Sequence, residues 1–212
     1  MIDTVIFDMD GTIFDTERIY HDAWLASGVP EKLYWQIIGR GHEEIQEIFR
    51  RNLSVPPEVL YARCDAATAR LLVGGIPKKP GLEEVLQYLQ RYAYHIVLAT
   101  SSLAENAKRK IDRAGVSNAF EAVISGDMVK HGKPAPDIYL KAAKAVSRVP
   151  EACMVVEDSF NGVRGGHAAG MYTVMIPDML QPDAEMRNTA DIILSSLREV
   201  PALLEKQKRE MQ

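Results

Sequence analysis

Short, continuous apolar segments rich in β-branched residues recur along the chain, with amphipathic segments between them. Such apolar segments are typical of strands buried on both faces of a sheet, and the amphipathic segments have the helical period. The predicted strands cover residues 4–7, 95–99, 122–124, 153–156, 172–176 and 191–194, and the clearest predicted helices cover residues 82–91, 104–113, 137–145 and 162–169. Because strands alternate with helices, we expect an α/β fold of right-handed βαβ units around a parallel sheet, with helices on both faces.

One long stretch interrupts this alternation. It has no convincing strand but contains segments of helical periodicity, which cover residues 17–27, 43–51 and 57–72. We therefore expect two domains, a core of residues 1–15 and 80–212 and a small all-α domain of residues 16–79. Because the insertion directly follows the first strand, it would lie over the carboxyl ends of the sheet, where open α/β sheets bind their ligands. Residues 203–212 are predicted to form a solvated helical tail.

The composition is that of a folded globular protein. The chain has 212 residues, 47% hydrophobic and 25% charged, and at about 150 residues per domain this length suits one core plus a smaller insertion. The net charge of −4 comes without a long basic block, so nucleic acid is not expected as a partner. We also expect no membrane partner, a cytoplasmic location and a monomer. Cys64 and Cys153 are isolated in the sequence, which indicates neither a disulfide nor a zinc site.

Two pairs of acidic residues follow predicted strands. Asp8 and Asp10 come after the first strand, and Glu157 and Asp158 end a later one. In a parallel sheet these strand ends share one edge, where up to four carboxylates would repel one another unless a hard divalent cation lay between them. Mg²⁺ is the cation that fits, and it normally completes its shell with water and phosphate oxygens. Taken alone, each pair could instead be ordinary turn or helix-capping residues.

Two further segments suit a phosphate group. Thr100 and Ser101 end a third strand and lead into a predicted helix. The N-terminus of that helix offers unsatisfied N–H donors, which suit a phosphate. The same residues are also typical of an ordinary serine-rich helix cap. Lys133 lies between Gly132 and Pro134 in a stiff loop, where it can bring a positive charge to a cluster of carboxylate and phosphate groups.

These motifs, in this order, resemble those of the haloacid dehalogenase-like (HAD) superfamily. The four motifs are Asp8-Met9-Asp10-Gly11-Thr12, Thr100-Ser101-Ser102, Gly132-Lys133-Pro134 and Glu157-Asp158-Ser159. The insertion after the first motif resembles the α-helical cap of subfamily I, which contains phosphatases and β-phosphoglucomutases. The resemblance covers the whole chain and implies a Rossmann-like core with a cap domain.

The resemblance also implies a role for each motif residue. Asp8 would be the nucleophile that forms an aspartyl-phosphate, and Asp10 the general acid and base. Thr100 and Ser101 would hold the phosphoryl oxygens, and Lys133 would tie Asp8 to the phosphoryl group. The Mg²⁺ set would comprise Asp8, Asp10 through its backbone carbonyl, Glu157 and Asp158.

Within this superfamily, the residues favour a phosphatase of a small phosphorylated metabolite such as a sugar phosphate. Asp10 counts against a dehalogenase, and the absence of lysine in residues 39–51 counts against imine chemistry. A β-phosphoglucomutase is the alternative, but it needs cations for a second phosphate. In the mutases these cations come from the cap loop and from the position just after the second motif, which are occupied here by His42 and Leu103. Arg40 and His42 are the candidate substrate residues of the insertion. A non-catalytic domain that only accepts a phosphoryl group is the minor alternative.

Overall fold

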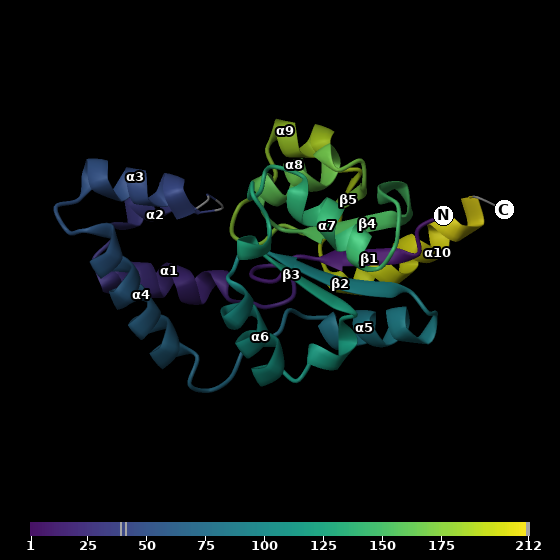
Figure 1. Cartoon of the computed structure of the whole chain (residues 1–212), viewed down its shortest axis with the longest axis horizontal. Coiled ribbons are helices and arrows are strands. Elements are labelled where there is room, and N and C mark those ends of the chain that lie inside the picture. Colours follow the sequence, from purple (N-terminus) through teal and green to yellow (C-terminus); the bar gives the residue numbers. More distant parts are fainter. Residues whose placement is uncertain (39, 41, 211–212) are drawn as a thin grey trace.

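A parallel sheet forms the centre of the structure, which is a computed structural model describing residues 1–38, 40 and 42–210 (Figure 1). Within these residues the sheet has six strands in the order β3-β2-β1-β4-β5-β6. The strands are β1 (Thr4–Phe7), β2 (His95–Thr100), β3 (Ala122–Ser125), β4 (Cys153–Glu157), β5 (Tyr172–Met175) and β6 (Ile192–Ile193). The prediction of a parallel α/β fold is confirmed, since each neighbouring pair of strands is parallel.

Helices cover both faces of this sheet. One apolar cluster joins α5, α6 and α10 to the sheet, while α7 packs in a cluster on the other face and α8 and α9 share a smaller one. The core helices are α5 (Leu82–Arg91), α6 (Ala104–Arg113), α7 (Asp137–Ala145), α8 (Phe160–Ala168), α9 (Ala184–Thr189) and α10 (Val200–Glu210), and the short 3₁₀ helices are η1 (Ser117–Ala119), η2 (Gly126–Met128), η3 (Pro150–Ala152) and η4 (Leu197–Glu199).

The register of the central strands decides where the motifs meet. Phe7 at the end of β1 is level with Leu98 in β2 and with Val156 in β4. The residues that follow these three positions therefore emerge at one edge of the sheet. The strand order also reverses between β1 and β4, which is where open α/β sheets form a binding crevice at their carboxyl ends.

A helical insert, α1–α4, follows β1 and forms the lobe on the left of Figure 1. Its helices are α1 (Glu17–Ser27), α2 (Glu31–Ile37), α3 (His42–Asn52) and α4 (Pro57–Leu71). The sequence analysis did not predict α2, because seven residues are too few to establish a helical period. Its formation depends on packing, since Leu33, Tyr34 and Ile37 are buried in an apolar cluster of the insert.

Two adjacent segments connect the insert to the core. The amide of Asp15 donates to the carbonyl of Pro77 over 2.9 Å, and the amide of Lys79 donates to the carbonyl of Ile13 over 3.0 Å. The Lys79 ammonium contacts Asp15 at 2.9 Å and Asp178 of a core loop at 2.7 Å. The chain thus enters and leaves the insert through one hydrogen-bonded pair of segments above β1.

The expectation of a solvated C-terminal tail is wrong for one face of that helix. Val200, Leu203 and Leu204 of α10 are buried in the apolar cluster shared with α5. The segment of α10 is short and rich in charged residues, so its sequence alone does not indicate which face packs on α5. Among the described residues, no helix has the length and apolarity needed to span a membrane.

Leu204→Ala should lower the free energy of unfolding by about 2–5 kcal/mol, because it leaves a cavity in a packed core. Urea unfolding followed by circular dichroism would measure this loss. Lys206→Ala on the exposed side of α10 is the matched control and should change the value by less than about 0.5 kcal/mol. Equal effects of the two substitutions would contradict the packing of α10.

Candidate active site

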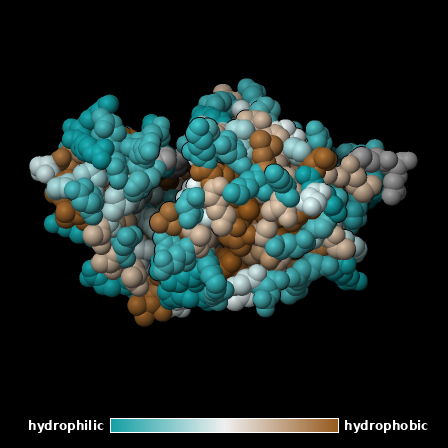
Figure 2. Space-filling view, in the orientation of Figure 1, coloured by the Kyte–Doolittle hydropathy of each residue, from teal (hydrophilic) through white to brown (hydrophobic). Residues whose placement is uncertain are grey.

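A cleft of about 350 Å³ lies between the insert and the carboxyl ends of the strands, and Figure 2 shows a hollow in the surface between the two lobes. Its lining includes every predicted site residue except Glu157. These are Asp8, Asp10, Thr100, Ser101, Lys133 and Asp158 from the core and Arg40 and His42 from the insert. Glu157 does not line the cleft, because it is completely buried.

Lys133 joins two of the buried acids. Its ammonium contacts Asp8 Oδ1 at 2.5 Å and Glu157 Oε1 at 2.6 Å, and it also donates to the carbonyl of Ala99 over 3.1 Å. The Tyr139 hydroxyl donates to the same Glu157 oxygen over 2.9 Å. The structure thus brings Lys133 to the carboxylates, as the loop sequence predicted. The single positive charge of Lys133 partly neutralises the carboxylates of Asp8 and Glu157.

The other Glu157 oxygen is held by the start of the next helix. It accepts hydrogen bonds from the amides of Asp158 and Ser159 over 2.9 Å each, and from the Ser159 hydroxyl over 3.0 Å. Burial alone would raise the pKa of Glu157, but the charge and hydrogen bond of Lys133, with the hydrogen bonds from the Ser159 amide and the Tyr139 hydroxyl, lower it below the ordinary value. Gly162 makes this arrangement possible, because a Cβ there would lie 1.7 Å from Glu157 Oε1.

Asp158 faces the cleft beside Asp8. The Thr12 hydroxyl donates to Asp158 Oδ1 over 3.0 Å. Burial, followed by the negative charges of Glu157 and Asp8, holds the pKa of Asp158 well above its usual range. Gly11 is required here for two reasons, because its φ is +85° and a Cβ would lie 2.2 Å from Asp158 Oδ2. A side chain at this turn would displace the carboxylate.

The acidic cluster suits a hard cation. Asp8, Glu157 and Asp158 each offer one carboxylate oxygen, and these oxygens lie within 4.8 Å of one another. Burial and the Glu157 charge raise the pKa of Asp8 to about 7 although Lys133 opposes the shift. Three buried carboxylates around one lysine therefore lack positive charge, and an all-oxygen donor set is the kind that Mg²⁺ or Ca²⁺ prefers.

Asp10 is turned towards different partners, and its carboxylate is not part of this cluster. Its oxygens accept hydrogen bonds from the Thr16 hydroxyl over 2.6 Å and the Ser102 hydroxyl over 3.2 Å. The Lys110 ammonium contacts both oxygens, at 2.6 and 2.7 Å. The sequence analysis missed Lys110, since one lysine in a charged amphipathic helix gives no signal of burial.

The insert contributes the opposite wall of the cleft. Arg40 donates from Nε to the carbonyl of Gln36 over 2.6 Å, and the His42 ring lies 4.6 Å from that of Tyr61. Gly39 and Gly41, which flank Arg40 in the sequence, lie outside the described residues. Glu17 was not predicted but also lines the cleft. Burial, with the charges of Asp10 and Asp178, raises the pKa of Glu17 to about 8.

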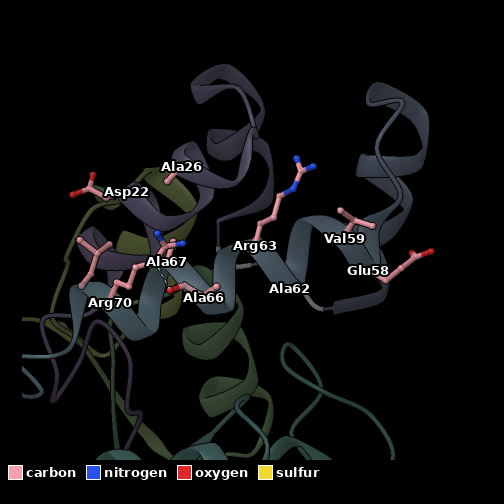
Figure 3. A pocket seen from close by; sticks show the side chains of 10 residues that line it. Asp22, Ala26, Glu58, Val59, Ala62, Arg63, Ala66, Ala67 and Arg70 are labelled. Carbon is pink, nitrogen blue, oxygen red and sulfur yellow. Dashed lines mark hydrogen bonds between the residues drawn. The ribbon is translucent and has the colours of Figure 1, made fainter.

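A second hollow, of about 730 Å³, lies on the insert itself (Figure 3). Asp22 and Ala26 of α1 line it, and the other lining residues come from α4. Arg70 there donates to the carbonyl of Ala66 over 3.1 Å. No motif residue lines this hollow, so the cleft above the sheet is the candidate active site.

The fold and this site define a class of α/β protein with a parallel sheet, a helical insert after the first strand and a buried acidic cluster at the carboxyl ends of β1 and β4. Residues 2–170 match the family described as haloacid dehalogenase-like hydrolase. The chain belongs to this family. It is a HAD-like phosphatase hydrolase of the subfamily with a helical cap, as the motifs indicated.

Individual relatives agree with this assignment. The "Phosphorylated carbohydrates phosphatase" of Thermotoga maritima is 32% identical over 181 residues, covering 82% of this chain and 84% of the relative. The "Probable pseudouridine-5′-phosphatase" of Drosophila melanogaster is 33% identical over 205 residues, covering 91% and 88%. The crystal structure of a candidate β-phosphoglucomutase from Thermotoga maritima superimposes with a TM-score of 0.79 at 26% identity, covering 97% of this chain and 99% of that one.

The raised pKa of Asp8 gives the metal-free protein a defined pH dependence. The pKa is about 7 in the folded chain against an ordinary value of 3.8, so its stabilising contribution is complete below about pH 4 and is lost as the pH rises through about 7. Asp8→Asn removes this component. In metal-free buffer, the free energy of unfolding of the variant relative to the wild type should therefore increase from about pH 5 to about pH 8, by up to about 1.4 kcal/mol per unit.

Urea unfolding at a series of pH values would measure this difference. The matched control is Asp127→Asn. Asp127 is an exposed carboxylate whose pKa a Ser125 hydrogen bond lowers, so it stays ionised in both states across this range. A difference for Asp8→Asn that is as flat as the control would contradict the raised pKa.

Proposed function

We propose that this enzyme is a Mg²⁺-dependent phosphatase that hydrolyses a small phosphorylated metabolite, such as a sugar phosphate, through an aspartyl-phosphate on Asp8. The observation that carries the proposal is the contact of Lys133 with both Asp8 and Glu157 beside Asp158. It supports a nucleophile that is held in a fixed position at the floor of the cleft. The carbohydrate-phosphatase relative supports the substrate class.

In the first step, an Asp8 oxygen attacks the phosphorus of the monoester and the bond from phosphorus to the leaving oxygen breaks. Protonated Asp10 gives its proton to the leaving alkoxide, which departs as an alcohol. In the second step, Asp10 takes a proton from water as the water oxygen attacks the phosphorus of the aspartyl-phosphate. Inorganic phosphate leaves, the Asp8 carboxylate is restored, and the net reaction consumes one water.

Mg²⁺ would be held by Asp8 and Asp158, with the backbone carbonyl of Asp10, while Glu157 supports the shell from below. When bound, the ion would neutralise the negative charge of the phosphoryl group and the carboxylates. Thr100 and the Ser101 amide would bind phosphoryl oxygens, since both residues line the cleft before the N-terminus of α6. Lys133 would offset the repulsion between Asp8 and the substrate.

The insert would act as a cap that selects the substrate, with the division into a core of residues 1–15 and 80–212 and a cap of residues 16–79. Arg40 and His42 would face the leaving group across the cleft. The surrounding wall of the insert contains the aromatic residues Tyr20 and Tyr61. Closure of this wall over the substrate would exclude water while the phosphoenzyme forms.

Activity should depend on both Mg²⁺ and Asp8. A panel of sugar phosphates, nucleotides and small phosphorylated metabolites, assayed for phosphate release, should give turnover that EDTA abolishes and Mg²⁺ restores. Asp8→Asn should abolish turnover, because the amide keeps the shape but lacks the nucleophilic charge. Phosphate release by this variant would show that Asp8 is not the nucleophile. A stable phosphoenzyme without product release, seen by mass spectrometry, would favour the non-catalytic phosphoryl acceptor.

A phosphosugar mutase is the second candidate, which the fold of the β-phosphoglucomutase-like structure supports. Such an enzyme needs cations for its second phosphate. Leu103 is 58% exposed at the start of α6, where it offers an apolar side chain. The apolar residue at the position after the second motif therefore favours a phosphatase over a mutase.

Incubation with β-glucose 1-phosphate and a trace of glucose 1,6-bisphosphate distinguishes the two reactions. If the sugar is accepted, inorganic phosphate should accumulate faster than glucose 6-phosphate, because nothing at Leu103 offsets the repulsion and desolvation of a second dianion. ³¹P NMR follows both products in one sample. Faster formation of glucose 6-phosphate would establish the mutase instead, and Arg40 would be the first cation to replace.

A further inference from the structure

One lysine of α6 is buried against the proposed acid and base. The Lys110 side chain is 8% exposed, and its ammonium lies 2.6 Å from Asp10 Oδ1 and 2.7 Å from Oδ2. The ammonium also lies 4.9 Å from the centre of the Tyr20 ring. A buried charge is costly unless it is paired and hydrogen-bonded, so this lysine and Asp10 form one compensated unit.

The neighbouring lysine of the same helix behaves differently. Lys108 is 76% exposed and contacts Asp112 one turn along α6 at 2.5 Å. This is an ordinary surface ion pair, which contributes little to stability. The two residues thus have the same charge on the same helix, but only Lys110 points to the site.

We propose that Lys110 is a positioning residue for Asp10, which rests on the proposed function of Asp10 as acid and base. Within the part of the chain that the structure describes, three donors from separate elements hold the Asp10 carboxylate. Thr16 donates from the start of the insert and Ser102 from the loop after β2, each to one oxygen. Of these three donors, Lys110 is the one that contacts both oxygens, so it fixes the direction in which the carboxylate points.

Lys110 acts through Asp10 and does not bind the substrate. It is absent from the residues that line the cleft, whereas Asp10, Ser102 and Tyr20 are present. The Lys110 ammonium is also paired with Asp10. Lys110 therefore does not replace the cation for a second phosphate that a mutase would carry at the position of Leu103. Tyr20 belongs to the insert, so the contact of its ring with the ammonium connects the position of Asp10 to the position of the insert.

A double-mutant cycle tests this role, because a residue that acts only through Asp10 has no effect once Asp10 is lost. The substrate is the sugar phosphate of the panel above that the wild type hydrolyses fastest, since its alkoxide leaving group needs a proton. K110M should lower kcat by about 10–100-fold and leave KM within about two-fold. In the D10N background, the same substitution should change kcat by less than about two-fold. K108M is the matched control and should retain wild-type kinetics.

The alternative outcomes each overturn the proposal. An equal loss in both backgrounds would make Lys110 a structural residue, and a kcat of K110M within about two-fold of the wild type would remove its role. A rise in KM at unchanged kcat would make it a substrate contact. If D10N keeps wild-type kcat, or if no panel compound releases phosphate, the proposed function itself fails and the role of Lys110 fails with it.

Two further variants keep the test valid if K110M does not fold. K110Q retains an N–H donor for Asp10 without the charge, and it should lower kcat in the same direction as K110M. K110R retains the charge and can contact both oxygens, so it should restore kcat to within about ten-fold of the wild type. Failure of K110R to exceed K110Q would contradict a role for the charged contact. Circular dichroism and thermal unfolding would establish that each variant is folded.

Discussion

The contact of Lys133 with Asp8 and Glu157 is the interaction on which the site depends. The parallel register of β1 and β4 brings these two acids to the same edge of the sheet, and burial makes their charges repel strongly. A lysine from the loop before α7 reduces this repulsion by contacting both carboxylates. Positive charge is still lacking beside Asp158, whose pKa is held well above its usual range by burial and by the charges of Glu157 and Asp8. A bound cation can supply that charge.

Glycine at two positions lets the backbone approach these acids closely. Gly11 gives the turn after β1 a left-handed conformation directly over Asp158, and Gly162 allows the first turn of α8 to approach Glu157. Asp158 and Ser159 then direct their amides to the buried Glu157 carboxylate. The positions of the charged groups thus depend on backbone geometry as much as on the acids themselves.

Residue order predicted most of the fold and the core of the site, because strand ends in a parallel sheet must meet at one edge. Asp8, Glu157 and Asp158 were found in this way, and Lys133 was found because glycine and proline restrict its loop. The misses have a different cause. Helix α2 and the buried face of α10 depend on packing against distant helices. Lys110 depends on the rotation of α6 about its own axis, which local sequence specifies only when its packing partners are known.

The two acids of the first motif are separated by one residue but are neutralised from opposite faces of the sheet. Asp8 is paired with Lys133, whose loop precedes α7, and Asp10 is paired with Lys110 of α6. Helices α6 and α7 pack on different faces of the sheet. Asp8 therefore shares Lys133 with Glu157, whereas Asp10 is paired with Lys110, so the proposed nucleophile and the proposed acid and base do not compete for one lysine. The two lysines thus reach the two carboxylates from different sides of the sheet, which lets Asp8 and Asp10 take different orientations although only one residue separates them.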